Sequence, residues 1–181
     1  MKLKGLTLTI LLCLGATWLN AQDDRGFSVE VGDTVPNVEI QMLDGTSIAM
    51  ESLRGEVVLL QFTASWCSVC IKEMPHLEEE VWQRFKDDGL KFYGIDLKEK
   101  SKVVQAFAER TGITYPLTLD PDGEIFKSFT TPNAGVTRNI LIDRDGQIVF
   151  LTRLFEREEF DQMIEKIAEL LDDKQAQTKI K

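Results

Sequence analysis

The feature that most constrains the fold is a nearly continuous apolar run, Val57–Phe62, followed closely by a change of hydrophobic period. Apolar runs that are rich in β-branched residues are typical of a central strand buried on both faces. After Cys67 the apolar residues recur at steps of three and four, which predicts one face of a helix ending at Gly89; these residues are Cys70, Met74, Leu77, Val81 and Phe85. Pro75 lies inside this pattern and is expected to kink the helix, because proline removes a backbone hydrogen bond.

The remaining segments extend this strand–helix unit along the chain. Leu90–Leu97 predicts a second buried strand, and Ser101 is expected to cap a helix that Gly112 ends. Turn residues at Asp44-Gly45 and in the stretch 143–146 predict two hairpins. The other expected elements are a short extended piece at 115–119 and helices near 125–129 and 160–171. Together they predict an α/β fold with a central mixed β-sheet, helices on both faces and an N-terminal β-hairpin.

The first 21 residues have a different character from the rest. Lys2 and Lys4 precede the apolar run Leu6–Leu19, and Ala21 is a small residue before a polar stretch. This layout predicts a secretory signal peptide over residues 1–21, with an uncleaved membrane anchor as the alternative. The apolar run is shorter than the roughly 20 residues that span a bilayer, which favours cleavage.

The rest of the chain divides into three parts. We predict a flexible leader at 22–29, one domain at 30–171 and a polar C-terminal tail at 172–181. The protein is expected to be exported, periplasmic after cleavage, and monomeric. A net charge of −9 argues against nucleic acid and anionic lipid as partners.

Three cysteines are too few for a disulfide-stapled scaffold, and Cys13 lies in the predicted signal peptide. Cys67 and Cys70 are separated by two residues, where the predicted strand runs into the helix. Unpaired N–H groups and the helix dipole favour a thiolate at Cys67, whereas Cys70 lies about one turn further and faces inward. The spacing predicts a redox disulfide in which Cys67 attacks and Cys70 resolves, without a bound cofactor.

Two other uses of the pair are a structural disulfide and half of a zinc site. A bridge that closes so short a loop constrains the unfolded chain little. Zinc needs about four ligands, whereas only His76 accompanies the pair in the chain that follows the signal peptide. We therefore expect no metal site.

Several motifs resemble the TlpA/ResA branch of the thioredoxin-like proteins. They are Asp44-Gly45, Leu53-Arg54-Gly55 followed by the run 57–62, the stretch Ala64-Ser65-Trp66-Cys67-Ser68-Val69-Cys70, Glu73-Met74-Pro75, and Leu141-Ile142-Asp143 with Asp145-Gly146. The similarity covers residues 30–171. It implies a thioredoxin fold and the reduction of protein disulfides outside the cytoplasm, often in c-type cytochrome precursors, with electrons from a membrane donor.

The resemblance also implies roles for two side chains near the cysteines. Glu73 matches a glutamate beneath the cysteines that assists proton transfer; its alternative is a solvated helix charge. Trp66 matches a tryptophan that shields the sulfurs and shapes the partner-binding face; its alternative is a core tryptophan.

The sequence departs from this pattern at Thr137, where thioredoxin-like proteins normally carry a cis-proline. A cis bond before threonine costs about 3–4 kcal/mol, so a trans Val136–Thr137 bond is expected unless packing forces the cis form. Val136 and Thr137 are the expected substrate-binding residues. The missing proline weakens both the alignment of a substrate chain and the exclusion of metal.

Gly135-Val136-Thr137-Arg138 also resembles a peroxiredoxin pattern in which an arginine faces the catalytic cysteine, and Thr63 resembles its upstream hydroxyl residue. If Arg138 reaches Cys67, its charge lowers the pKa of the thiol further; the alternative is a surface arginine paired with an acid. The sequence thus leaves three hypotheses: a disulfide reductase, a thiol peroxidase that uses Cys67 with Arg138 and Thr63, and a non-catalytic binding or metal-carrying module.

Overall fold

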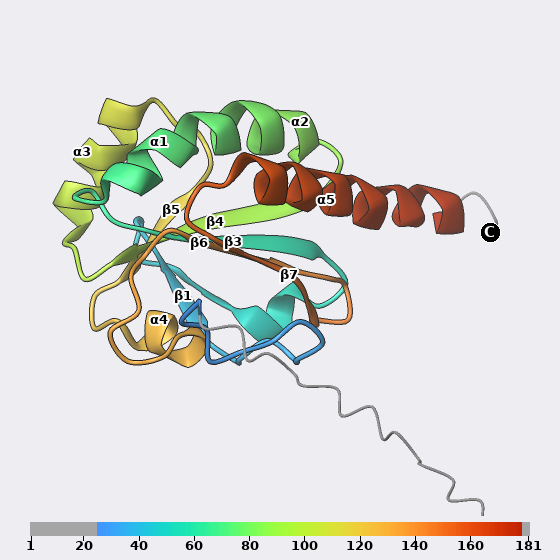
Figure 1. Cartoon of the computed structure of the whole chain (residues 1–181), viewed down its shortest axis with the longest axis horizontal. Helices are drawn as coiled ribbons and strands as arrows, with labels where there is room; N and C mark the ends of the chain where they lie inside the picture. The colour runs from blue at the N-terminus through green and yellow to red at the C-terminus, as the bar shows by residue number, and fades with distance from the viewer. Residues whose placement is uncertain (1–24, 179–181) are drawn as a thin grey trace, which may run out of the picture.

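The computed structural model describes residues 25–178, so the predicted signal peptide and Cys13 lie outside the described residues. The centre of the molecule is one seven-stranded mixed sheet with the order β2-β1-β5-β4-β3-β6-β7 (Figure 1). Its strands are β1 (Glu39–Met42), β2 (Ser47–Ala49), β3 (Val57–Thr63), β4 (Leu90–Leu97), β5 (Leu117–Asp120), β6 (Arg138–Ile142) and β7 (Ile148–Arg153). The predicted α/β class is confirmed.

The strand β3 lies in the interior of the sheet, between β4 and β6, and is buried at all seven positions. It pairs parallel with β4 and antiparallel with β6, so both of its edges are covered. The apolar run at 57–62 therefore forms the central strand that its composition predicts.

Helices cover the two faces of the sheet unequally (Figure 1). One face carries α1 (Ser68–His76), the π segment η2 (Leu77–Trp82), α2 (Gln83–Phe85), α3 (Ser101–Thr111) and α5 (Arg157–Thr178). The other face carries α4 (Glu124–Phe129), and the 3-10 turn η1 (Met50–Leu53) packs there through Met50. Each face buries its own apolar cluster, which confirms the prediction of helices on both faces.

Pro75 does not interrupt the helix that begins at Ser68. The helix continues to Phe85, and its hydrogen bonding changes to the wider π type over Leu77–Trp82, directly after the proline turn. Ser101 is the first residue of α3 and not its cap, since Lys100 is the N-cap and no side chain caps the helix. Gly112 ends α3 with a φ of 70°, as predicted.

The two predicted hairpins are present at the ends of the sheet. β1 and β2 pair antiparallel across Asp44-Gly45, and β6 and β7 pair antiparallel across the turn at 143–146. Both place turn residues where the chain must reverse.

Both ends of the described chain extend beyond the predicted domain. Phe27 forms a β-bridge with Thr130, and the N–H of Ser28 donates to the carbonyl of Phe129, so the part of the predicted leader from Arg25 contacts the domain. At the other end α5 continues into the predicted polar tail, as far as Thr178 (Figure 1). Within residues 25–178 no helix is long and apolar enough to span a membrane.

Candidate active site

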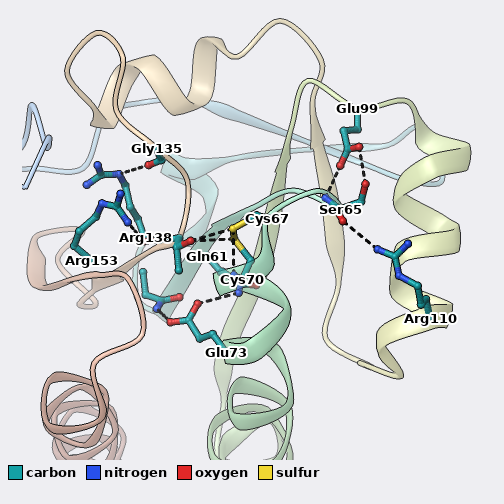
Figure 2. Close-up of a disulfide and its surroundings, with 12 residues drawn as sticks. Gln61, Ser65, Cys67, Cys70, Glu73, Glu99, Arg110, Gly135, Arg138 and Arg153 are labelled. Carbon is teal, nitrogen blue, oxygen red and sulfur yellow. Dashed lines mark hydrogen bonds between the residues drawn. A yellow bond between two sulfur atoms is a disulfide. The ribbon is translucent and has the colours of Figure 1, made fainter.

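The two cysteines form a disulfide where β3 leads into α1 (Figure 2). Cys67 is the N-cap of α1, and its sulfur accepts a hydrogen bond from the N–H of Cys70 at 3.1 Å. Cys67 retains 8% of its surface, whereas Cys70 is fully buried. A partner molecule can therefore reach only the first sulfur of the pair.

Thr137 lies against the disulfide, at the start of β6. Its hydroxyl oxygen is 3.1 Å from the Cys67 sulfur and 3.2 Å from the Cys70 sulfur. A disulfide has no proton to give, so the hydroxyl is the donor in this state. The sequence alignment therefore placed Thr137 correctly beside the cysteines.

The backbone at Thr137 is unusual for a β-branched residue. Its φ is 68°, in the left-handed region, and no peptide bond within the described residues is cis, so the Val136–Thr137 bond is trans. The N–H of Thr137 donates to the carbonyl of Phe62, and its carbonyl accepts from the N–H of Leu154. These two bonds, with burial of the side chain, hold the strained conformation in place.

Thr137→Pro is expected to destabilise the protein by about 2–4 kcal/mol, because proline cannot adopt this φ and has no N–H for Phe62. Urea denaturation measures the change, and Thr137→Ser, which keeps both the hydroxyl and the N–H, is the matched control. A proline variant as stable as the wild type would contradict the importance of the observed backbone conformation.

Glu73 is fully buried on α1, one turn after Cys70 (Figure 2). Its carboxylate accepts a hydrogen bond from Nδ2 of Asn139 at 2.6 Å and a long one from Nε2 of Gln61 at 3.4 Å. Burial raises the pKa of Glu73 to about 7, although both amides act in the opposite direction. The alternative of a solvated helix charge is therefore wrong.

The partners of Glu73 were not identified from the sequence. Gln61 lies on β3 and also accepts a hydrogen bond from the Tyr115 hydroxyl at 2.9 Å, and Asn139 lies on β6. Both are buried polar residues within mostly apolar strands. A polar side chain inside such a run is the signal that could have found them, because a buried amide needs a hydrogen-bonding partner.

Trp66 and Val136 lie differently with respect to solvent. Trp66 is 66% exposed, so the alternative of a core tryptophan is wrong, whereas Val136 is buried next to Thr137. An exposed indole directly before Cys67 leaves an apolar surface beside the accessible sulfur.

Arg138 is buried and belongs to the opposite side of the sheet from Glu73. Its guanidinium lies over the Phe27 ring, 4.4 Å from the centroid, and its Nε donates to the carbonyl of Gly135. Figure 2 shows this side chain directed away from the disulfide. The structure thus supports neither the peroxiredoxin-like placement nor the surface arginine.

Thr63, the second residue of the peroxiredoxin-like pattern, ends β3. Its hydroxyl is buried and has no hydrogen-bonding partner within the described residues. The structure shows no contact between it and either sulfur.

Within residues 25–178 no group of three or more His, Cys, Asp or Glu side chains could hold a metal ion. His76 is half-buried, bonds Glu80 at 2.7 Å through Nδ1 and stacks on Phe155. The only histidine of the chain is therefore engaged with Glu80 of η2 and with Phe155, which precedes α5, and not with the cysteine pair.

Comparison with known proteins agrees with this geometry. A profile of the AhpC/TSA family matches residues 31–151. The thiol-disulfide oxidoreductase ResA of Bacillus thuringiensis subsp. konkukian is 28% identical over 144 residues, covering 78% of this chain and 82% of that protein. ResA of Bacillus subtilis is also 28% identical, over 145 residues, covering 80% of this chain and 79% of that protein.

Two solved structures share the fold. The solution structure of a candidate protein disulfide isomerase from Bacteroides thetaiotaomicron is 49% identical, with a TM-score of 0.78, and the match covers 81% of this chain and 93% of that one. A candidate thiol:disulfide interchange protein DsbE from Chlorobium tepidum has a TM-score of 0.70 at 23% identity, covering 80% and 99%, which supports the fold alone.

The chain therefore belongs to the AhpC/TSA family. It is a thiol–disulfide oxidoreductase similar to the TlpA/ResA proteins, with a thioredoxin-like fold and a Cys-x-x-Cys pair. The resemblance seen in the sequence is confirmed.

Proposed function

We propose that the protein reduces disulfides of other proteins outside the cytoplasm, with Cys67 as the attacking sulfur and Cys70 as the resolving one. The observation that carries this proposal is the difference in access: the Cys67 sulfur is reachable at a helix N-terminus, whereas Cys70 is buried behind it. No charged side chain lies between the two cysteines to favour a strong oxidant.

Reduction proceeds in two exchange steps. The Cys67 thiolate attacks one sulfur of the substrate disulfide, and the displaced substrate thiolate takes up a proton. Cys70 then loses its proton and attacks the Cys67 sulfur, which releases the second substrate thiolate and forms the disulfide seen here. The substrate gains two electrons and the pair loses two, which a membrane electron donor returns in the cell.

Three features support the first step at Cys67. The N–H of Cys70 donates to this sulfur, and the sulfur lies at the positive end of α1. The Thr137 hydroxyl is within hydrogen-bonding distance as well. All three stabilise a thiolate relative to a thiol and so lower the pKa of Cys67 below its ordinary value.

Glu73 is the proposed proton acceptor for Cys70 in the second step. The two residues are buried on the same helix, three positions apart, and a carboxyl with a pKa of about 7 changes charge in the neutral range. Asn139 orients the carboxylate through its 2.6 Å bond.

Glu73→Gln is expected to lower turnover roughly 10- to 100-fold, because the amide cannot accept the Cys70 proton. In the wild type, ionisation of Glu73 should make the rate of reduction rise around pH 7, and in Glu73→Gln this rise should be absent. Rates of insulin reduction from pH 5 to 9 measure both effects, with the exposed Glu79→Gln as the control for charge. A Glu73→Gln variant that keeps the wild-type pH profile would contradict this role.

Insulin reduction by the purified protein with dithiothreitol tests the reductase activity itself. We expect reduction well above the rate of dithiothreitol alone, and a rate equal to dithiothreitol alone would contradict the proposal. Rapid oxidation of Cys67 by peroxide would instead favour the peroxidase hypothesis.

Export and partners belong to the same proposal. The signal-like segment at 1–21 supports a periplasmic location, and the similarity to ResA supports action on thiols and disulfides. We further propose that the protein is a monomer and that cytochrome c precursors are among its substrates. Mass spectrometry of the protein from a periplasmic extract should find a chain that begins after Ala21. A chain that begins at Met1 would indicate a retained anchor.

A further inference from the structure

A second set of ionisable side chains lies beside the cysteine motif, apart from Glu73 (Figure 2). Glu99, between β4 and α3, accepts two hydrogen bonds from Ser65: one from its N–H at 2.6 Å and one from its hydroxyl at 2.7 Å. Nη2 of Arg110, on α3, donates to the carbonyl of Ser65 at 3.1 Å. Every polar group of Ser65 is therefore bonded to an ionisable side chain of the segment that follows β4.

Ser65 occupies the short link that joins β3 to α1, two residues before Cys67. The N–H of Cys67 donates to the carbonyl of Ala64 at 3.0 Å, so this link is a tight turn. Trp66 is largely exposed and contributes little to holding it. The position of the Cys67 sulfur thus depends on how firmly Ser65 is held.

Glu99 is suited to hold this turn because it binds through both carboxylate oxygens. Hydrogen bonds to an ionised acceptor are about twice as strong as neutral ones, and a two-point contact also fixes orientation. The bond from Cys70 N–H to the Cys67 sulfur is only 3.1 Å long, and such a bond weakens within a few tenths of an ångström.

Asp96 lies below this contact, one residue before the end of β4 and in register with Thr63 on β3. No N–H or hydroxyl group of the described residues donates to its carboxyl oxygens, which leaves the Glu99 carboxyl as their neighbour. Burial first, and then the charge of Glu99 and a hydrogen bond with its side chain, raise the pKa of Asp96 to about 8. Asp96 is therefore neutral at pH 7 and does not repel the carboxylate that binds Ser65.

We propose that Glu99, with Arg110, is a positioning residue for the attacking sulfur: it holds the Ser65 peptide so that Cys67 stays at the start of α1, within reach of the Cys70 N–H. This inference rests on the proposed role of Cys67. Glu99 touches neither sulfur and acts through the backbone of the turn.

The sign of a pKa change separates positioning from simple electrostatics. Removing a nearby negative charge by itself stabilises the Cys67 thiolate and lowers its pKa. Releasing the turn moves the sulfur away from its N–H donor and the helix N-terminus, which raises the pKa. Positioning by Glu99 therefore predicts a rise in the pKa of Cys67 when Glu99 is neutralised.

The experiment compares Glu99→Gln with the unsubstituted protein, both in a Cys70→Ser background. The rate of Cys67 alkylation by iodoacetamide, followed from pH 4 to 10, gives the pKa of the thiol. We expect Glu99→Gln to raise that pKa by about one unit, a roughly tenfold loss of thiolate below it. With Cys70 intact, the same substitution should lower insulin reduction at pH 7 by a similar factor.

Two further variants make the test specific. Glu109→Gln removes one negative charge from the exposed face of α3. It is expected to change neither the rate of Cys67 alkylation nor the rate of insulin reduction. Ser65→Ala keeps the N–H bond and loses the hydroxyl bond, so its effect should be intermediate. If Glu99→Gln does not fold, Ser65→Ala provides the test. A Cys67 pKa in Ser65→Ala equal to that of the wild type would then overturn the inference.

The outcomes also separate this inference from the proposed function. An unchanged or lowered pKa of Cys67 in folded Glu99→Gln overturns the positioning role alone. Turnover that survives in Cys67→Ser would overturn the proposed function, whatever Glu99 does.

Discussion

Cys67→Ser is expected to abolish disulfide reduction, leaving only the rate of the thiol donor itself. A serine hydroxyl is not ionised at neutral pH and cannot form a disulfide, so the first exchange step has no nucleophile. The buried Cys70 cannot take over, because its sulfur has no exposed surface. Insulin turnover measures the loss.

Cys70→Ser should behave differently, because it removes only the second step. The variant is expected to attack once and then accumulate as a mixed disulfide with its substrate, visible by mass spectrometry and released by excess thiol. If Cys67→Ser accumulates as the mixed disulfide and Cys70→Ser does not, the roles of the two sulfurs are reversed.

Asp96→Asn is expected to stabilise the protein in a pH-dependent way. The folded chain holds the Asp96 proton up to about pH 8, whereas the unfolded chain releases it near the ordinary pKa of 3.8. Between these values the folded state binds more protons than the unfolded state, so the free energy of unfolding falls as pH rises. Asparagine has no proton that titrates, so the free energy of unfolding of the variant does not decrease in this way as the pH rises.

A shift of about four pKa units, at about 1.4 kcal/mol per unit, corresponds to about 5 kcal/mol at pH 8. Screening by solvent reduces the expected gain to about 2–4 kcal/mol at that pH, and the gain is close to zero at pH 4. Urea denaturation at pH 4, 6 and 8 measures it, with the exposed Asp88→Asn as control. An equal gain at pH 4 and pH 8, or a loss at pH 8, would contradict the buried neutral state of Asp96.

Local patterns predicted most of the fold because each of them reports burial directly. The strand at 90–97 has the bounds that its apolar run predicts, and the helical period after Cys67 is correct as far as Phe85. The sequence predicted a kink at Pro75, but not the change to π-type hydrogen bonding over Leu77–Trp82, because several hydrogen-bonding patterns can accommodate a missing donor. Contacts of Phe27 with Arg138 join distant segments, and no local pattern encodes them.

The candidate site was predictable where the motif itself carries the chemistry. Cys67, Cys70 and Thr137 lie together as the sequence indicates. The sequence left open whether Arg138 faces Cys67 or the surface, because neighbours along a strand point to opposite faces and the pattern does not show which face Arg138 takes. Asn139, the next residue, is the one that reaches Glu73.

The second cluster at Ser65 escaped sequence analysis for a related reason. Glu99 and Arg110 follow Ser65 by 34 and 45 positions and resemble ordinary surface charges of a helical segment. Only the parallel pairing of β3 with β4 brings them to the same edge of the sheet as the cysteines. The spacing of residues within the cysteine motif does not show which strands pair, so it could not predict this cluster.

The reduction potential of the Cys67–Cys70 couple, measured in glutathione buffers, tests the central claim most directly. We expect a value near that of thioredoxin, about −270 mV, because a pair at that potential gives electrons to protein disulfides. A value near −120 mV, typical of a strong oxidant, would contradict the proposed role as a reductant.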